Sequence, residues 1–321
     1  MLACRTFSGP DVRIVFMGSP AFAVPALHAL AADPNIVISL VITQPDRRAG
    51  RGQQLAAPAV KTAAVALGLP LLQPASMRDD DAMFALAAAQ PDLLVVVAYG
   101  ELLRRAVLET PPHGALNVHP SLLPCYRGAA PIPAAILNGD LCSGISIIRL
   151  MHRMDAGPIV AQEEMDITPT DTTATLSERL ARRAATLLPR ICHDYGAGAL
   201  TLREQNDAQA TYTHEWTKRD ARIDWNAPAV AIERLVRAAQ PWPVAWSTVD
   251  GERLRVLRAT IGGAHSSGAT TPGDVQLIDD TLLVQTGTGA LELLDVQPAN
   301  KRAMSAVGWW RGRRAAALRL E

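Results

Sequence analysis

The sequence predicts an α/β fold, with a Rossmann-like parallel sheet followed by a smaller all-β barrel domain. In the first part of the chain, apolar runs rich in Val, Ile and Leu alternate with helical patterns, which is typical of parallel strands joined by helices. In the second part, short alternating segments are separated by Gly-rich turns, which favours a small barrel. All six Trp lie between Trp216 and Trp310, and all four Phe at or before Phe84, so two differently built cores are expected.

The junction between the two parts is placed in a polar stretch without periodicity, EQNDAQATYT, at residues 204–213. We therefore expect a first domain at 1–204, a linker at 205–213 and a second domain at 214–321. The total of 321 residues suits two domains of ordinary size.

Composition excludes several classes of protein. No apolar run approaches the ~20 residues that span a bilayer, and the N-terminus does not have the pattern of a secretory signal. The four cysteines are scattered without a C-x-x-C pair, which argues against disulfides and zinc and favours the cytoplasm. The formal net charge is zero, yet from Lys301 onward six Lys/Arg face a single acidic residue, Glu321.

The first strand, at 12–17, is followed by a turn and a helical pattern from about 22 to 30. The turn carries only Gly18, whereas a dinucleotide pyrophosphate requires the pattern G-x-G-x-x-G, so an NAD-dependent enzyme is disfavoured. The pattern of apolar residues also predicts strands at 36–42, 69–72, 92–98, 144–150 and 159–164. It predicts helices at 59–67, 80–88 and 173–188, and another helix that ends near 138–139. In the second domain it places a helix at 228–238 and strands at 253–259, 274–278, 281–285 and 290–296.

A basic loop is expected after the second strand, where the sequence at 43–52 reads TQPDRRAGRG. Arg47, Arg48 and Arg51 lie within five residues of one another, and clustered guanidinium groups attract phosphates. A solvated surface turn is the plain alternative, although long loops in compact domains are often functional.

The stretch NVHPSLLPCYRG, at 117–128, is the strongest candidate for a site, because it follows a strand that should end beside the strand at 92–98. Residues two apart in a strand point the same way, so Asn117 and His119 share a face and could hold a carbonyl oxygen as it becomes negative. The apolar loop Ser121, Leu122, Leu123 and Pro124 is expected to cover a ligand or to pack inward. A turn with a satisfied histidine is the alternative.

These residues resemble the signature of the 10-formyltetrahydrofolate-dependent formyltransferases, which combine Asn-x-His, SLLP and a distant Asp-x-Gly. Asp155, in Met-Asp-Ala-Gly-Pro, matches that distant position. The resemblance implies that Asn117, His119 and Asp155 are catalytic and that Ser121 to Pro124 line the site of the co-substrate 10-formyltetrahydrofolate, with no metal. It also implies that backbone around Val97, Ala98 and Tyr99 faces the pterin ring.

Within that family, the chain is similar to the members that formylate the α-amine of methionine on initiator methionyl-tRNA. The basic loop, RIDW at 222–225, PWP at 241–243 and QPANKRAMS at 297–305 carry this similarity. It implies an OB-like second domain and phosphate contacts from Arg47, Arg48, Arg51, Lys301 and Arg302, with Arg311, Arg313 and Arg314 as further candidates. We also expect a cytoplasmic monomer. Arg48 stands where Pro is usual, so the loop should be more basic and less stiff.

The implied reaction passes through a tetrahedral oxyanion; the attacking amine loses a proton, and the leaving nitrogen of the folate gains one. Asn117 would donate to the oxyanion, His119 would assist it or shuttle the proton, and Asp155 would orient His119 and accept the proton, directly or through water. Two other functions stay open: a formyltransferase for a small amine, such as glycinamide ribonucleotide or an amino-sugar nucleotide, and a non-catalytic RNA-binding protein. The basic loop and second domain disfavour the first, and the three catalytic residues disfavour the second.

Overall fold

The computed structural model describes residues 11–49, 54–263, 271–313 and 318–321. The chain folds into two compact units. The first unit takes Met1–Gly128, Ser143–Asp166 and Ser177–Tyr212; the second takes Thr213–Glu321 together with two earlier segments, Ala129–Cys142 and Ile167–Leu176.

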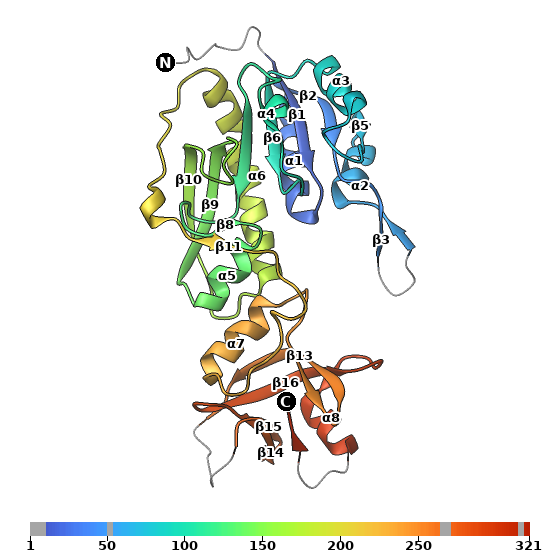
Figure 1. Cartoon of the computed structure of the whole chain (residues 1–321), viewed down its shortest axis with the longest axis vertical. Helices are drawn as coiled ribbons and strands as arrows, with labels where there is room; N and C mark the ends of the chain where they lie inside the picture. The colour runs from blue at the N-terminus through green and yellow to red at the C-terminus, as the bar shows by residue number, and fades with distance from the viewer. Residues whose placement is uncertain (1–10, 50–53, 264–270, 314–317) are drawn as a thin grey trace. The chain divides into compact units, whose positions relative to one another are not determined.

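The first unit is built on a mostly parallel sheet in the order β10-β9-β7-β6-β1-β2-β5 (Figure 1). All neighbours from β7 to β5 run parallel, whereas β9 runs antiparallel to β7. The central strand β6 is buried along its whole length, which explains its unbroken apolar sequence LLVVV. The strands are β1 (Val12–Gly18), β2 (Ile36–Ile42), β5 (Leu71–Leu72), β6 (Leu93–Val97), β7 (Ala115–His119), β9 (Cys142–Arg149) and β10 (Ile159–Asp166).

Helices connect these strands as the alternating sequence pattern predicts, and the predicted Rossmann-like α/β domain is confirmed. The first helices pack on the β2–β5 side of the sheet, where α1 contacts β2 and α2 contacts β5. The helices of this part of the chain are η1 (Ala21–Ala23), α1 (Val24–Ala32), α2 (Ala59–Ala66), α3 (Asp80–Ala88), α4 (Arg105–Leu108) and α6 (Thr173–Gly196). The short α4 was not predicted from the sequence, and α6 extends beyond the predicted 173–188.

The predicted basic loop contains a small hairpin, which projects from the sheet of its own unit (Figure 1). Strand β3 (Arg47–Ala49) pairs antiparallel with β4 (Gln54–Ala56). At its base, the carboxylate of Asp46 accepts hydrogen bonds from Lys61 at 2.7 Å and from Gln73 at 2.8 Å. These bonds and the ion pair lower the pKa of Asp46, with the Gln73 hydrogen bond as the larger cause.

The second unit contains a strongly curved antiparallel sheet in the order β12-β13-β16-β15-β14-β18. The two ends of this order approach each other, because Thr248 of β12 exchanges backbone hydrogen bonds of 3.0 and 2.9 Å with Glu321, next to β18. The sheet is thus nearly closed, which confirms the predicted small barrel. Its strands are β12 (Trp246–Val249), β13 (Glu252–Ile261), β14 (Asp274–Ile278), β15 (Thr281–Gln285), β16 (Ala290–Pro298), β17 (Met304–Ser305) and β18 (Leu318–Arg319).

Inside the barrel, the apolar residues of alternating strand positions meet those of the helices. Trp225 is 4% exposed and donates its indole N–H to the hydroxyl of Ser247 at 2.9 Å, so the polar edge of this buried ring is satisfied. Helix α7 packs both on β13 and on α5. The helices of this unit are α5 (Pro131–Asn138), α7 (Ala229–Ala238) and α8 (Ala306–Arg313). Within the described part of the chain, no helix is both long and apolar enough to cross a membrane.

Candidate active site

The carboxyl ends of β1, β6 and β7 lie side by side in the sheet of the first unit. Gly18 pairs with Val97, and Asn117 pairs with Val96, so the ends of the three strands are in register. A Cβ on Gly18 would lie 2.8 Å from the carbonyl oxygen of Val97, which explains the need for glycine at this close approach. The chain order reverses between β1 and β6, and ligands of open α/β sheets bind at such a switch point.

His119, at the end of β7, is 4% exposed, and both of its ring nitrogens face specific groups. Nε2 lies 2.9 Å from the carbonyl oxygen of Tyr126. Because a carbonyl can only accept, Nε2 must carry a hydrogen and donate it. The other nitrogen, Nδ1, lies 3.6 Å from a carboxylate oxygen of Asp155, which is too long for a good hydrogen bond and leaves Nδ1 available.

Asp155 is brought to His119 by a loop between β9 and β10. Its backbone is left-handed, with φ of 48°, and its Oδ2 accepts a hydrogen bond of 2.9 Å from the backbone N–H of Gly128. Within the described residues, Oδ1 has no hydrogen-bond partner. Gly157 allows the loop to close, because a Cβ there would lie 1.8 Å from the carbonyl oxygen of Arg149.

Asn117 lies two residues before His119 on β7 and is half-buried. In the described part of the chain, its side-chain amide makes no hydrogen bond. Asn117 and His119 therefore share a strand face, and the amide remains a free donor beside the imidazole. The structure thus brings together His119 and Asp155, which are 36 residues apart, with Asn117 on the same strand as His119.

The loop that carries Ser121, Leu122, Leu123 and Pro124 is fixed mainly by the protein itself. Ser121 is 1% exposed and donates to the carbonyl of Cys125 at 2.7 Å, and Leu123 is 3% exposed in the core. The hydroxyl of Ser146 bonds to the backbone of both, at 2.7 and 3.0 Å. Leu122 and Pro124 stay half-buried, and they are the two side chains of the loop that remain accessible.

Residues 205–213, expected from the sequence to be a linker, are hydrogen-bonded to the segment that follows the loop. Thr211 accepts from the backbone N–H of Tyr126 through its hydroxyl, at 2.8 Å, and from that of Arg127 through its carbonyl, also at 2.8 Å. Strand β11 (Tyr212–Thr213) pairs with β8 (Arg127–Gly128), and the short helix η2 (Asp207–Gln209) precedes it. Nothing in the sequence indicated a role for Arg127, Gln205 or Asp207, and here Arg127 donates hydrogen bonds to both of the others.

Comparison with known protein families finds a match in each of the two parts of the chain. The formyl transferase family matches residues 12–192, and the formyl transferase C-terminal domain matches residues 215–314. The chain belongs to the formyl transferase family.

Individual relatives match this formyl transferase over nearly their whole length. The chain is 49% identical to the methionyl-tRNA formyltransferase of Chloroflexus aggregans, over 94% of this chain and 97% of that one. It is 44% identical to that of Pseudomonas entomophila, over 94% and 96%. Among solved structures, a sugar 3N-formyl transferase has a TM-score of 0.64 at 15% identity, over 92% and 100% of the two chains, which shows likeness of fold.

The basic residues predicted to contact tRNA are exposed where the structure describes them. Arg47 and Arg48 lie on β3, and Arg47 donates to the side-chain oxygen of Gln44 at 2.8 Å. Arg51 and Arg314 lie outside the described residues. Lys301 and Arg302 are exposed in the turn between β16 and β17 of the second unit.

The turn at the end of β6 combines unusual backbone with an unsatisfied polar group. Ala98 and Gly100 have φ values of 50° and 89° on either side of Tyr99. The ring of Tyr99 is 2% exposed, and its hydroxyl has no hydrogen-bond partner among the described residues. Burial, and to a lesser degree Glu101, raises the pKa of this tyrosine to about 12, so it stays protonated and can only donate or accept as a neutral group.

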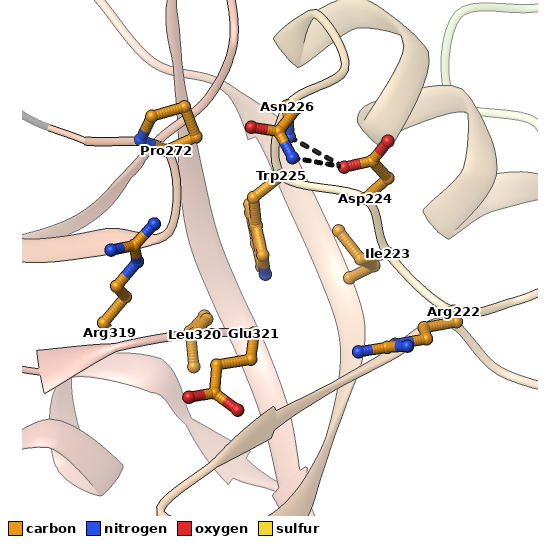
Figure 2. A pocket seen from close by; sticks show the side chains of 9 residues that line it. All are labelled: Arg222, Ile223, Asp224, Trp225, Asn226, Pro272, Arg319, Leu320 and Glu321. Atoms are coloured by element: carbon orange, nitrogen blue, oxygen red, sulfur yellow. Dashed lines mark hydrogen bonds between the residues drawn. The ribbon is translucent and has the colours of Figure 1, made fainter.

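A cavity of about 530 Å³ lies wholly within the second unit, around Trp225 (Figure 2). It contains none of the residues predicted to be catalytic, all of which belong to the first unit. Its lining carries Arg222 and Arg319 but also Asp224 and Glu321, so its charge favours neither sign of ligand. Asp224 already accepts two hydrogen bonds from Asn226, at 3.0 and 2.9 Å (Figure 2). Among the described residues, no three or more His, Cys, Asp or Glu side chains are grouped to hold a metal ion.

Proposed function

We propose that this formyl transferase moves a formyl group from 10-formyltetrahydrofolate to the α-amino group of methionine on initiator methionyl-tRNA. The relatives that are 44% to 49% identical over 94% of the chain carry the name methionyl-tRNA formyltransferase. Their similarity spans both the sheet domain and the barrel.

One observation carries the chemistry. A buried imidazole has one nitrogen bonded to a carbonyl and the other facing the Asp155 carboxylate at 3.6 Å, beside a free amide on the same strand. Formyl transfer to an amine needs a hydrogen-bond donor for the formyl oxygen and a base for the proton of the amine. Asn117, His119 and Asp155 supply those groups at one edge of the sheet.

The donor set at this edge fits the formyl end of 10-formyltetrahydrofolate. When bound, that co-substrate supplies the formyl group as an amide-like carbonyl. The unpaired amide of Asn117 matches its oxygen, and the half-buried side chains of Leu122 and Pro124 offer apolar contact to a flat ring. Ser121 and Leu123 act behind them, because their own side chains are buried in the unit and hold the loop in place.

The geometry supports a division of labour among the three residues. Asn117 donates to the formyl oxygen as negative charge develops on it. Nε2 of His119 is committed to Tyr126, so its working nitrogen is Nδ1, which accepts or returns a proton opposite Asp155. Oδ2 of Asp155 is held by Gly128, and Oδ1 is the oxygen available to the amine, directly or through one water.

Recognition of the tRNA is assigned to exposed cations on both units. Arg47 and Arg48 on the hairpin, and Lys301 and Arg302 on the barrel, position the phosphate backbone without reading bases. Arg311 and Arg313 are poorer candidates, because they are paired with Asp280 and Asp250. We also propose that the enzyme is cytoplasmic and that it works as a monomer. Sedimentation of the purified chain would test the monomeric state.

The deciding experiment offers labelled 10-formyltetrahydrofolate to the full chain with methionyl initiator tRNA and, in parallel, with glycinamide ribonucleotide. Label on the tRNA alone is expected. Label on the small amine alone would keep the chemistry of Asn117, His119 and Asp155 and overturn the tRNA substrate. No label on either acceptor would favour a non-catalytic RNA-binding protein.

A further inference from the structure

The side chain of Gln205 spans two parts of the first unit that are far apart in the sequence. Its Nε2 donates to the carbonyl oxygens of both Asp155 and Gly157, each at 2.7 Å. Its Oε1 accepts from the guanidinium of Arg127, at 3.1 and 2.8 Å. One half-buried amide thus uses both of its ends, donating to the catalytic loop and accepting from the interior.

The orientation of this amide is fixed by Arg127. That side chain is fully buried, and its guanidinium also contacts the carboxylate of Asp207 at 2.8 Å and the hydroxyl of Tyr212 at 3.2 Å. A guanidinium can only donate, so it selects the oxygen end of Gln205. The nitrogen end is then left for the two carbonyls, which can only accept, and no other orientation satisfies both sides.

The two carbonyls belong to a strained turn. Asp155 is not a glycine, yet its φ is 48°, a left-handed conformation that a residue other than glycine keeps only when its surroundings enforce it. The Gln205 amide donates to the carbonyl of Asp155 itself and to that of Gly157 two residues later. These two hydrogen bonds bridge the turn and stabilise its conformation. The Asp155 carboxylate is thereby directed toward His119 and the N–H of Gly128.

We infer that Gln205 is a positioning residue for catalysis, which acts by holding Asp155 in its left-handed turn and is itself oriented by Arg127. This inference rests on the proposed role of Asp155. It gives the segment at 205–213 a part in the reaction, although its sequence has the composition of a linker. Among the described residues, Gln205 makes no hydrogen bond to His119 or Asn117, and its bonds to the active site go to the Asp155 loop.

The test is Gln205→Glu in the full chain, because it separates the two ends of the side chain. A glutamate still accepts from Arg127, and more strongly, but it places a carboxylate oxygen against two carbonyls. We expect kcat for formylation to fall about ten- to a hundred-fold, since small misplacement of a catalytic group has effects of that size. KM for the tRNA and the folate should stay within about two-fold, because neither binding surface is touched.

The matched control is Gln285→Glu in the second unit. The Gln285 amide also bridges two backbone carbonyls, those of Thr286 and Gly289, at 3.1 and 3.2 Å. It should change the melting temperature as Gln205→Glu does and leave kcat unchanged. If Gln205→Glu does not fold, Gln205→Met replaces it, because Met keeps the length, removes the donor and leaves Arg127 paired with Asp207.

The decisive comparison repeats Gln205→Glu in an Asp155→Asn background. If Gln205 acts through Asp155, the second substitution should add less than about two-fold to the loss in kcat. Full additivity, or near-normal kcat in Gln205→Glu alone, would overturn the inference and leave the proposed function standing. Normal kcat in Asp155→Asn alone would overturn both the role of Asp155 and the inference.

Discussion

Each catalytic candidate has at least one polar side-chain atom without a hydrogen bond to another described residue. His119 commits Nε2 to a carbonyl and keeps Nδ1; Asp155 commits Oδ2 to a backbone N–H and keeps Oδ1. The amide of Asn117 has no partner within the described residues. A site for two substrates needs such unpaired groups, and hydrogen bonds to the protein hold the side chains of His119 and Asp155 in place.

Asn117→Ala should lower kcat by about a hundred- to a thousand-fold, the usual effect of removing one oxyanion donor. Stability should hardly change, because the amide contributes no hydrogen bond to the described protein. Steady-state formylation of methionyl-tRNA, with a thermal melt of the same sample, measures both. Asn35→Ala, in an exposed turn, is the control; a folded Asn117→Ala enzyme with near-full activity would exclude the role of Asn117.

Gly157→Ala should destabilise the first unit, because its Cβ would lie 1.8 Å from the backbone oxygen of Arg149, which cannot move aside cheaply. A loss of about 1–3 kcal/mol is expected, as for other forced overpacking. Chemical denaturation of both proteins measures it. Gly312→Ala is the matched control: nothing lies within 4 Å of its added Cβ, so it should be neutral or slightly stabilising.

At the scale of elements, the β3–β4 hairpin is an arm that carries exposed arginines and is held by hydrogen bonds where it leaves the sheet. Arg47 and Arg48 are exposed on β3, while Asp46 at the base is bound by Lys61 and Gln73. These bonds restrict how the arm leaves the sheet, and the arm presents its charge outward. This arrangement suits binding to a phosphate backbone more than to a small molecule.

Reversing that charge, with Arg47→Glu and Arg48→Glu together, should raise KM for methionyl-tRNA about ten-fold or more and leave KM for the folate unchanged. The salt dependence should also weaken, since each lost phosphate contact reduces the slope by about one. Kinetics from low to moderate salt would show both. Arg78→Glu with Arg104→Glu makes the same charge change elsewhere on the unit; equal effects from the two pairs would argue against a specific contact.

Elements with local signals were predicted well from the sequence, and elements that depend on distant partners were not. The strand at 36–42 and the buried strand β6 follow from their own apolar residues. The pairing of β8 with β11 joins residues 85 apart, and no local pattern indicates it. The site shows the same division: period-two alternation places Asn117 with His119, Asp155 required the family resemblance, and Gln205 left no signal.

At the scale of the whole molecule, acid should destabilise the protein. Hydrogen bonds from Arg127 and then Arg153 lower the pKa of Asp207, and those from Gln73 and Lys61 lower that of Asp46. A carboxyl whose pKa is lower in the folded state stabilises folding above its ordinary pKa of about 3.9, and this contribution is lost as the pH falls through the folded value. Burial lowers the pKa of His113, so this residue also makes the folded state less stable as the pH falls. Its effect begins at a higher pH than that of the carboxyls, at about 6.5, the ordinary pKa of histidine.

We therefore expect the melting temperature to fall from pH 7 toward pH 3, and Asp207→Asn to lose stability at pH 7 but to approach the wild type below about pH 4. Differential scanning calorimetry over this range tests the prediction. A deficit of equal size at every pH would mean that the charge of Asp207 is not the cause.

The path of the chain between its two units has a consequence for proteolysis. The second unit incorporates Ala129–Cys142, and within it α5 packs on α7 while Arg237 donates to the carbonyl of Asp171 at 3.0 Å. A protease that nicks the polar stretch at 205–213 would therefore cut the chain without releasing two independent pieces. The nicked halves should migrate together on a native gel and separate only in denaturant, and a recombinant fragment ending at 204 should expose the apolar side of α5 and aggregate.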